Sequence, residues 1–142
     1  MWEEFYQDRL AAWCQLRQQA SVLPTDQSLI LINNWWFRAP MVNCSINWNS
    51  KQDWPGPWNL LTLSGYCELA KALGIVYTIM LIETIDYKNL TIIQTDQDNL
   101  VLVDHGKYIL NWAPGEMLNI RSTPINTVKN RIDSSELASF LK

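Results

Sequence analysis

The spacing of apolar residues changes along this chain, from a helical period at its start to β-branched runs in its second half. The larger side chains of residues 2–18 recur at the i, i+3, i+4 spacing of an amphipathic helix: Trp2, Phe5, Tyr6, Arg9, Leu10, Trp13 and Leu16 or Arg17. Residues 29–37 are apolar almost all round. They predict a buried helix that Thr25 or Asp26 caps and that ends before Pro40.

A shorter helix is predicted within residues 64–75. Ser64 is a suitable N-cap, Gly74 is typical of a helix end, and Cys67 would lie in the first turn. The chain therefore places a cysteine at the start of a helix that leads into its β-rich half.

Strand patterns follow this helix. Residues 76–82 and 90–94 are rich in β-branched side chains, which favour strands. Residues 100–112 are typical of a β-hairpin whose turn is marked by Asp104 and Gly106.

One more helix is predicted at the C-terminal end. Asp133, with Glu136 three residues later, forms a variant of the capping box, whereas residues 116–132 are polar and predicted to be irregular. The order of these predicted elements along the chain predicts an α+β fold. Helices come first, an antiparallel sheet follows, and a single helix comes last. In this fold the cysteine-bearing helix packs on a small antiparallel sheet.

The length of 142 residues fits a single domain, residues 1–142. Within it we expect a helical N-terminal part (1–40), a helix with an antiparallel sheet (64–114), and an extension with a terminal helix (115–142). Hydrophobic residues make up 48% of the chain, which is enough apolar material for a core.

Charge and hydropathy exclude several classes of protein. A net charge of -3 argues against a nucleic-acid partner, because neutralising phosphates requires a dense basic face. No apolar run reaches the length of a membrane-spanning helix, and the first residues are acidic where a signal peptide is basic. We therefore expect a protein made in the cytoplasm, with no membrane span.

The cysteines and the single histidine give no pattern of a metal site. Cys14, Cys44 and Cys67 are odd in number and widely spaced, which predicts reduced thiols. There is no Cys-x-x-Cys pair, His105 is the only histidine, and no glycine-rich phosphate loop is present. We expect no metal and no cofactor.

The segment Trp54-Pro55-Gly56-Pro57-Trp58 combines the residues of a rigid turn with two of the eight tryptophans. One interpretation is a structural clamp in which both rings cover the core. The other is a docking patch for a partner protein, because tryptophan is enriched at binding hot spots. The sequence leaves both open.

Cys67 is the candidate nucleophile. A cysteine in the first turn of a helix lies near free N–H groups and the positive end of the helix dipole, which lower the pKa of a thiol. The same position also suits a cysteine that packs as a small hydrophobe. His105 is the one imidazole available as a base, and it falls in the predicted hairpin turn.

The Gly-x-Cys helix, its Leu-Gly-Ile end and the strands that follow resemble the transglutaminase-like branch of the papain-like cysteine folds, over residues 64–114. In that family a histidine opens the next strand and an aspartate lies near the end of a later one. The resemblance places Cys67 at the nucleophile, Asn99 at the histidine and Asn111 at the aspartate. It implies a degenerate member, since an amide cannot take a proton from a thiol.

A Trp-Pro-x-Pro-Trp turn before a Tyr-Cys-x-x-Ala-x-x-Leu-Gly helix, in a short Trp-rich chain, also resembles small proteins of tailed bacteriophages. This resemblance implies a virion-associated, non-enzymatic structural or assembly component of the tail, baseplate or neck, which binds neighbouring subunits. The candidate contact elements are the polar 116–132 stretch and five aromatic residues: Trp2, Phe5, Trp13, Trp54 and Trp58.

The alternative is a cysteine peptidase or acyl transferase with Cys67 as the nucleophile and His105 as its base. This reading requires His105 to lie within hydrogen-bond reach of Cys67. A host-directed adaptor or inhibitor is a third reading, which the sequence does not separate from a virion component.

Overall fold

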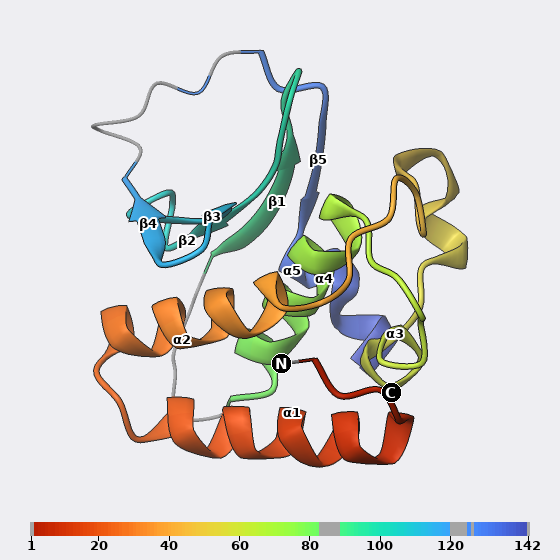
Figure 1. Ribbon diagram of the computed structural model, residues 1–142. Coiled ribbons are helices and arrows are strands. Elements are labelled where there is room, and N and C mark those ends of the chain that lie inside the picture. Colours follow the sequence, from red (N-terminus) through yellow and green to blue (C-terminus); the bar gives the residue numbers. More distant parts are fainter. Residues whose placement is uncertain (1, 83–88, 120–124, 126, 142) are drawn as a thin grey trace.

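The chain folds into a pair of N-terminal helices, a central helix and a five-stranded antiparallel sheet, with a short helix near the C-terminal end (Figure 1). The computed structural model describes residues 2–82, 89–119, 125 and 127–141. Its helices are α1 (Tyr6–Ser21), α2 (Thr25–Phe37), the 3-10 helix η1 (Trp48–Asp53), α3 (Pro57–Leu60), α4 (Glu68–Met80), α5 (Ser134–Leu137) and the 3-10 helix η2 (Ala138–Leu141). The predicted α+β class is confirmed.

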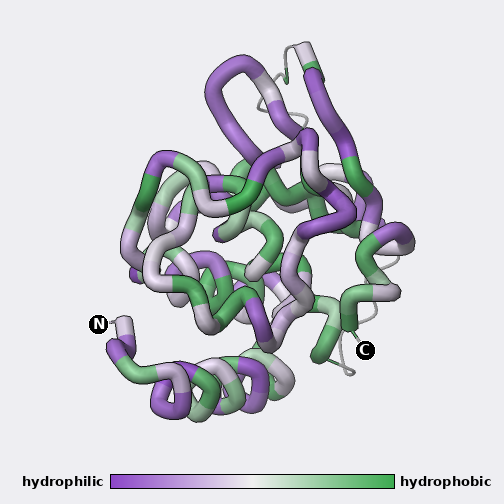
Figure 2. Tube along the Cα trace, turned by 90° about the vertical axis from the view of Figure 1, so that its right-hand side faces the viewer, coloured by the Kyte–Doolittle hydropathy of each residue, from purple (hydrophilic) through white to green (hydrophobic). Residues whose placement is uncertain are grey.

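The helices α1 and α2 run antiparallel and pack against each other (Figure 1). Hydrophilic and hydrophobic residues alternate along α1 (Figure 2). Its residues Trp13 and Leu16 are buried in the core. α2 begins directly after Pro24, so Thr25 and Asp26 lie in its first turn. The prediction that one of them caps the helix is wrong, although Asp26 still places a negative charge near the positive end of the helix.

The helix α4 is the centre of the molecule. Residues 69–79 are all buried, and α4 packs on α2 as well as on three strands of the sheet. These are β1 (Leu90–Gln94), β2 (Asn99–Val103) and β3 (Tyr108–Ala113). The sequence predicted that this helix ends at Gly74 and that residues 76–82 form a strand. That prediction is wrong, because α4 continues to Met80.

Packing at Gly74 explains the difference. A Cβ atom added there would lie 2.5 Å from a carbon of the Trp36 ring, so the glycine allows α2 to approach α4 closely and does not end the helix. The β-branched residues that follow are buried among other elements. Tertiary packing of this kind outweighs a weak local preference for strand.

The sheet has the strand order β4-β3-β2-β1-β5. Its strands are β1 (Leu90–Gln94), β2 (Asn99–Val103), β3 (Tyr108–Ala113), β4 (Glu116–Leu118) and β5 (Asn130–Asp133). The register pairs Ile92 with Val101 on one side and with Ile132 on the other. These three side chains join the main core, whereas Ile93 and Leu100 belong to a smaller apolar cluster. The central strands are thus apolar on both faces.

Of the sequence predictions for the turns and caps around the sheet, two are confirmed and one is partly wrong. The predicted hairpin turn is confirmed, with positive φ angles at Asp104, His105 and Gly106. The capping box of Asp133 and Glu136 is confirmed as the start of α5. The prediction that 116–132 is irregular is wrong for β4 and for the first residues of β5, while 120–124 and 126 lie outside the described residues.

Candidate functional site

The N-terminal end of α4 is where the candidate catalytic positions meet. Cys67 is the N-cap of α4 and therefore lies one residue before its first turn, so Ser64 is not the cap as predicted. Asn99 is the first residue of β2, and Asn111 lies within β3. The structure brings these two asparagines against the same end of the helix.

Asn111 links three elements at this point. Its Nδ2 donates to the carbonyl oxygens of Glu68 (3.1 Å) and Asn99 (2.8 Å), and its backbone N–H donates to Asn33 Oδ1 at 2.9 Å. The residue is buried and has a φ of 68°, a conformation that asparagine tolerates better than most residues. The Asn111 amide is thus occupied in holding α4, β2 and α2 together.

Asn99 is occupied in the same way. Its backbone N–H donates to Glu68 Oε1 at 3.0 Å, and its Oδ1 accepts a hydrogen bond from Trp48 Nε1 at 2.8 Å. Burial raises the pKa of the Glu68 carboxyl, and the charge of Asp98 raises it further. The hydrogen bond from Asn99 and the charge of Lys71 only partly offset this rise.

Cys67 lies beneath the segment 41–47. Its backbone N–H donates to Ser45 Oγ (3.1 Å), the Ser45 hydroxyl donates to Cys67 Sγ (3.4 Å), and the thiol donates to the Ile46 carbonyl oxygen (3.5 Å). Burial raises the pKa of the Cys67 thiol, but hydrogen bonds with Ser45 and with the backbone of Ile46 and Ala70 outweigh it. The net effect lowers the pKa of this thiol from its ordinary value.

His105 lies away from this site. It is exposed in the turn between β2 and β3, and its Nε2 lies 2.6 Å from Asn89 Nδ2. Asn99, at the first end of β2, contacts α4, whereas the turn follows Val103 at the other end. Five extended residues separate those ends by about 13 Å. The structure therefore does not bring Cys67 and His105 together.

The sequence pointed to Asn99 and Asn111 but not to the groups that hold them. Ser45 and Trp48 come from the irregular segment before α3, and Asn33 comes from the middle of α2. The only sequence signal was the density of asparagine and serine in residues 38–63. No local pattern shows which of these side chains will reach α4.

The five aromatic residues predicted as partner contacts have different environments. Trp13 and Trp54 are fully buried in the core, with 1% and 3% of their surface exposed. Trp2 is half-buried. Phe5 (67% exposed) and Trp58 (42% exposed) reach the surface, and the Trp58 ring also packs edge-on against the Trp13 ring, with the centroids 5.3 Å apart.

The Trp54–Trp58 segment therefore combines both interpretations. Trp54 faces inward, where its ring packs edge-on against Trp48 and its Nε1 donates to the Asn47 carbonyl oxygen. Trp58 is partly exposed on α3, and its ring packs against Trp13. The chain is helical from Pro57 onward, so the predicted rigid turn is wrong beyond Gly56. Proline suits that first helical position because it has no N–H to satisfy there.

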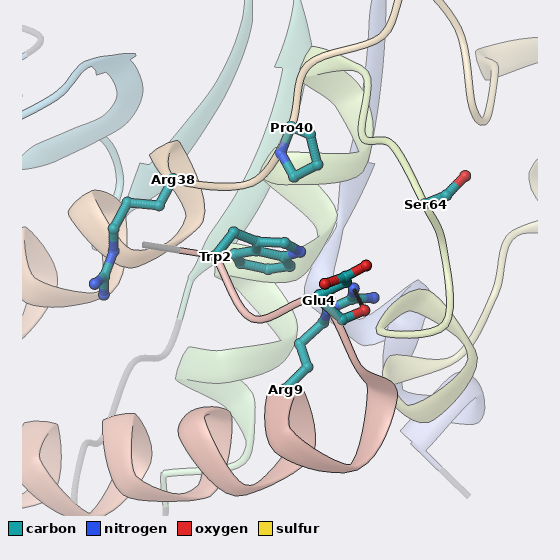
Figure 3. Close-up of a pocket in the computed structure, with 6 residues that line it drawn as sticks. All are labelled: Trp2, Glu4, Arg9, Arg38, Pro40 and Ser64. Carbon is teal, nitrogen blue, oxygen red and sulfur yellow. Dashed lines mark hydrogen bonds between the residues drawn. The ribbon is translucent and has the colours of Figure 1, made fainter.

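An open pocket of about 590 Å³ lies beside the N-terminal segment. Its lining residues are Trp2, Glu4, Arg9, Arg38, Pro40 and Ser64 (Figure 3). The Arg9 guanidinium is buried, and all its hydrogen bonds go to the backbone carbonyl oxygens of Glu3, Glu4, Leu61 and Leu63. Arg9 thus joins the N-terminal segment to the end of α3 and has no donor left for a ligand.

No protein-family model matches the chain, and no curated protein or solved structure is detectably similar to it. In the described part of the chain, no group of three histidine, cysteine or acidic residues could hold a metal ion. No helix among the described residues has the length and apolar character needed to cross a membrane.

Proposed function

We propose that this chain is a non-enzymatic structural or assembly subunit that binds neighbouring proteins in a larger particle, most specifically in the tail, baseplate or neck of a tailed bacteriophage. The carrying observation is the use of Asn99 and Asn111 as structural links at the end of α4. The placement in a virion rests on the resemblance of the Trp-rich turn and cysteine helix to small phage proteins.

The amide network supports the non-enzymatic part of the proposal. A thiol enzyme needs a group that takes the proton of its cysteine and a second group that orients it. Around Cys67 the corresponding positions carry amides, and Asn99 Oδ1 accepts a hydrogen bond from Trp48 while Asn111 Nδ2 donates to the carbonyl oxygen of Glu68. His105, the one imidazole of the chain, lies at the other end of β2.

Three exposed aromatic residues, Phe5, Tyr6 and Trp58, support the binding part. The Tyr6 hydroxyl donates to the Trp58 carbonyl oxygen at 3.3 Å, which holds the start of α1 against α3. All three residues are exposed. Aromatic side chains with a rigid backing are the residues that dominate protein interfaces.

Particle composition tests the proposal. Mass spectrometry of purified phage particles should detect the chain at a constant ratio to tail proteins. Replacing Phe5 by serine should reduce its incorporation. Val22→Ser is the matched control, because Val22 is an equally apolar, 82% exposed residue at the other end of α1. A chain that is absent from particles, or equal incorporation of both variants, would contradict the proposal.

A cysteine peptidase or acyl transferase is the second candidate, and the lowered pKa of Cys67 is the observation in its favour. A low-pKa thiol is the nucleophile that such enzymes use. Incubation with an ester substrate should then leave an acyl group on Cys67, detected by peptide mapping. An acylated Cys67 that turns over would replace the structural proposal, whereas an unmodified Cys67 would eliminate the second candidate.

A further inference from the structure

Two of the three cysteines converge on one backbone oxygen. The thiol of Cys44 and the thiol of Cys67 each lie 3.5 Å from the carbonyl oxygen of Ile46. Their sulfurs therefore cannot be farther apart than twice that distance. All three cysteines are free thiols, and Cys14 lies on α1.

The two cysteines differ in accessibility and in the secondary structure around them. Cys44 is exposed, in a segment that belongs to no helix and passes beside the first turn of α4 (Figure 1). Cys67 is buried at the N-cap of α4. Backbone hydrogen bonds hold the two segments in parallel, from Tyr66 N–H to the Pro40 carbonyl and from Val42 N–H to the Tyr66 carbonyl.

We propose that Cys44 and Cys67 form a reversible intramolecular disulfide when the protein meets a peroxide. A disulfide needs sulfurs about 2 Å apart and Cα atoms within about 7 Å of each other. The two sulfurs must therefore move closer together. The irregular segment that carries Cys44 makes this movement, since α4 is fixed in the core. Closure replaces the hydrogen bonds at Ile46 by a covalent link between this segment and α4.

The chemistry balances in two steps. The exposed Cys44 releases its proton, its thiolate attacks one oxygen of hydrogen peroxide, and the O–O bond breaks. Cys44 becomes a sulfenic acid, and the hydroxide that leaves takes up the proton as the first water. The Cys67 sulfur then attacks the sulfur of Cys44. The S–S bond forms, the S–OH bond breaks, and the hydroxyl group leaves with the Cys67 proton as a second water. Two thiols are oxidised by two electrons, and one peroxide is reduced to two waters.

Disulfide mapping of the full chain tests this proposal. The reduced protein is treated with hydrogen peroxide, unfolded, blocked with N-ethylmaleimide and digested for mass spectrometry. A peptide pair that joins Cys44 to Cys67 within one chain is expected, with Cys14 carrying the blocking group. Reduction by dithiothreitol should return all three cysteines to the blocked form.

Single substitutions separate this link from unspecific oxidation. Cys14→Ser should leave the Cys44–Cys67 link at wild-type yield, whereas Cys44→Ser should leave Cys67 blocked by maleimide after the same treatment. Links that involve Cys14, links only between two chains, or full blocking of Cys44 and Cys67 would overturn the proposal. None of these outcomes depends on whether the chain assembles into particles.

Discussion

Thr78 is the position where one small substitution should cost most stability. Its Oγ accepts hydrogen bonds from Trp13 Nε1 (2.9 Å) and Trp36 Nε1 (3.0 Å), and it donates to the Gly74 carbonyl oxygen (2.7 Å). A threonine hydroxyl has one donor and two acceptor sites, so its capacity is full. This single oxygen joins α1 and α2 to α4 in the core.

Thr78→Val keeps the shape of the side chain and removes both acceptor sites. The two indole N–H groups are buried, and each buried donor without a partner costs about 1–3 kcal/mol. Together they should lower the free energy of unfolding by about 2–6 kcal/mol, a large part of the total stability of a domain. For a chain of this size the melting temperature should fall by about 10 °C.

Urea denaturation monitored by tryptophan fluorescence and by circular dichroism measures this loss. Thr78→Ser is the matched control, because it keeps the hydroxyl and removes one methyl group, at a cost of about 1 kcal/mol. Equal m-values would show that the comparison concerns stability and not the unfolded state. If Thr78→Val were as stable as Thr78→Ser, the indole N–H groups would not depend on this oxygen, and the reasoning would be refuted.

Three further predictions concern α4 and its N-terminal end. Gly74→Ala should lower the free energy of unfolding by about 1–2 kcal/mol, because overpacking against the Trp36 ring exceeds the gain in helix propensity. A variant more stable than the wild type in urea denaturation would contradict this. Ser45→Ala should raise the pKa of Cys67, measured as a shift of its alkylation midpoint to higher pH by peptide mapping, and an unchanged midpoint would refute the role of Ser45. Burial raises the pKa of Glu68 in the folded state, so the native protein binds this proton more tightly than the unfolded chain does. The free energy of unfolding should therefore fall as the pH rises from the pKa of Glu68 in the unfolded chain through its pKa in the folded state. Glu68→Gln should remove this fall in urea titrations from about pH 4 to about pH 7, whereas an unchanged pH profile would show that Glu68 is not its source.

Local chemistry in the sequence determined much of the fold. Asp104 and Gly106 predicted the hairpin turn, and Asp133 with Glu136 predicted the start of α5, because each signal depends only on residues a few positions apart. The change from helical spacing to β-branched runs was sufficient to predict the α+β class.

The candidate site was only partly predictable. The sequence placed Asn99 and Asn111 near the cysteine helix through a family resemblance, and both do meet the end of α4. Ser45 and Trp48, which contact Cys67 and Asn99, come from a segment without periodic structure. Contacts between such a segment and a distant helix depend on the packed core and leave no local signal.

Tertiary packing alone decided three properties of this protein. Gly74 lies inside a helix because the Trp36 ring occupies the space that a Cβ atom would fill. This contact joins residues that lie on two different helices. Trp54 is buried in the core and Trp58 is partly exposed, although the sequence around them is nearly symmetric. Cys44 and Cys67 lie near one carbonyl oxygen although 22 residues separate them in the sequence. The reason is the same in all three cases: the packing of the elements sets which residues are close in space, and the linear order of residues does not contain that information.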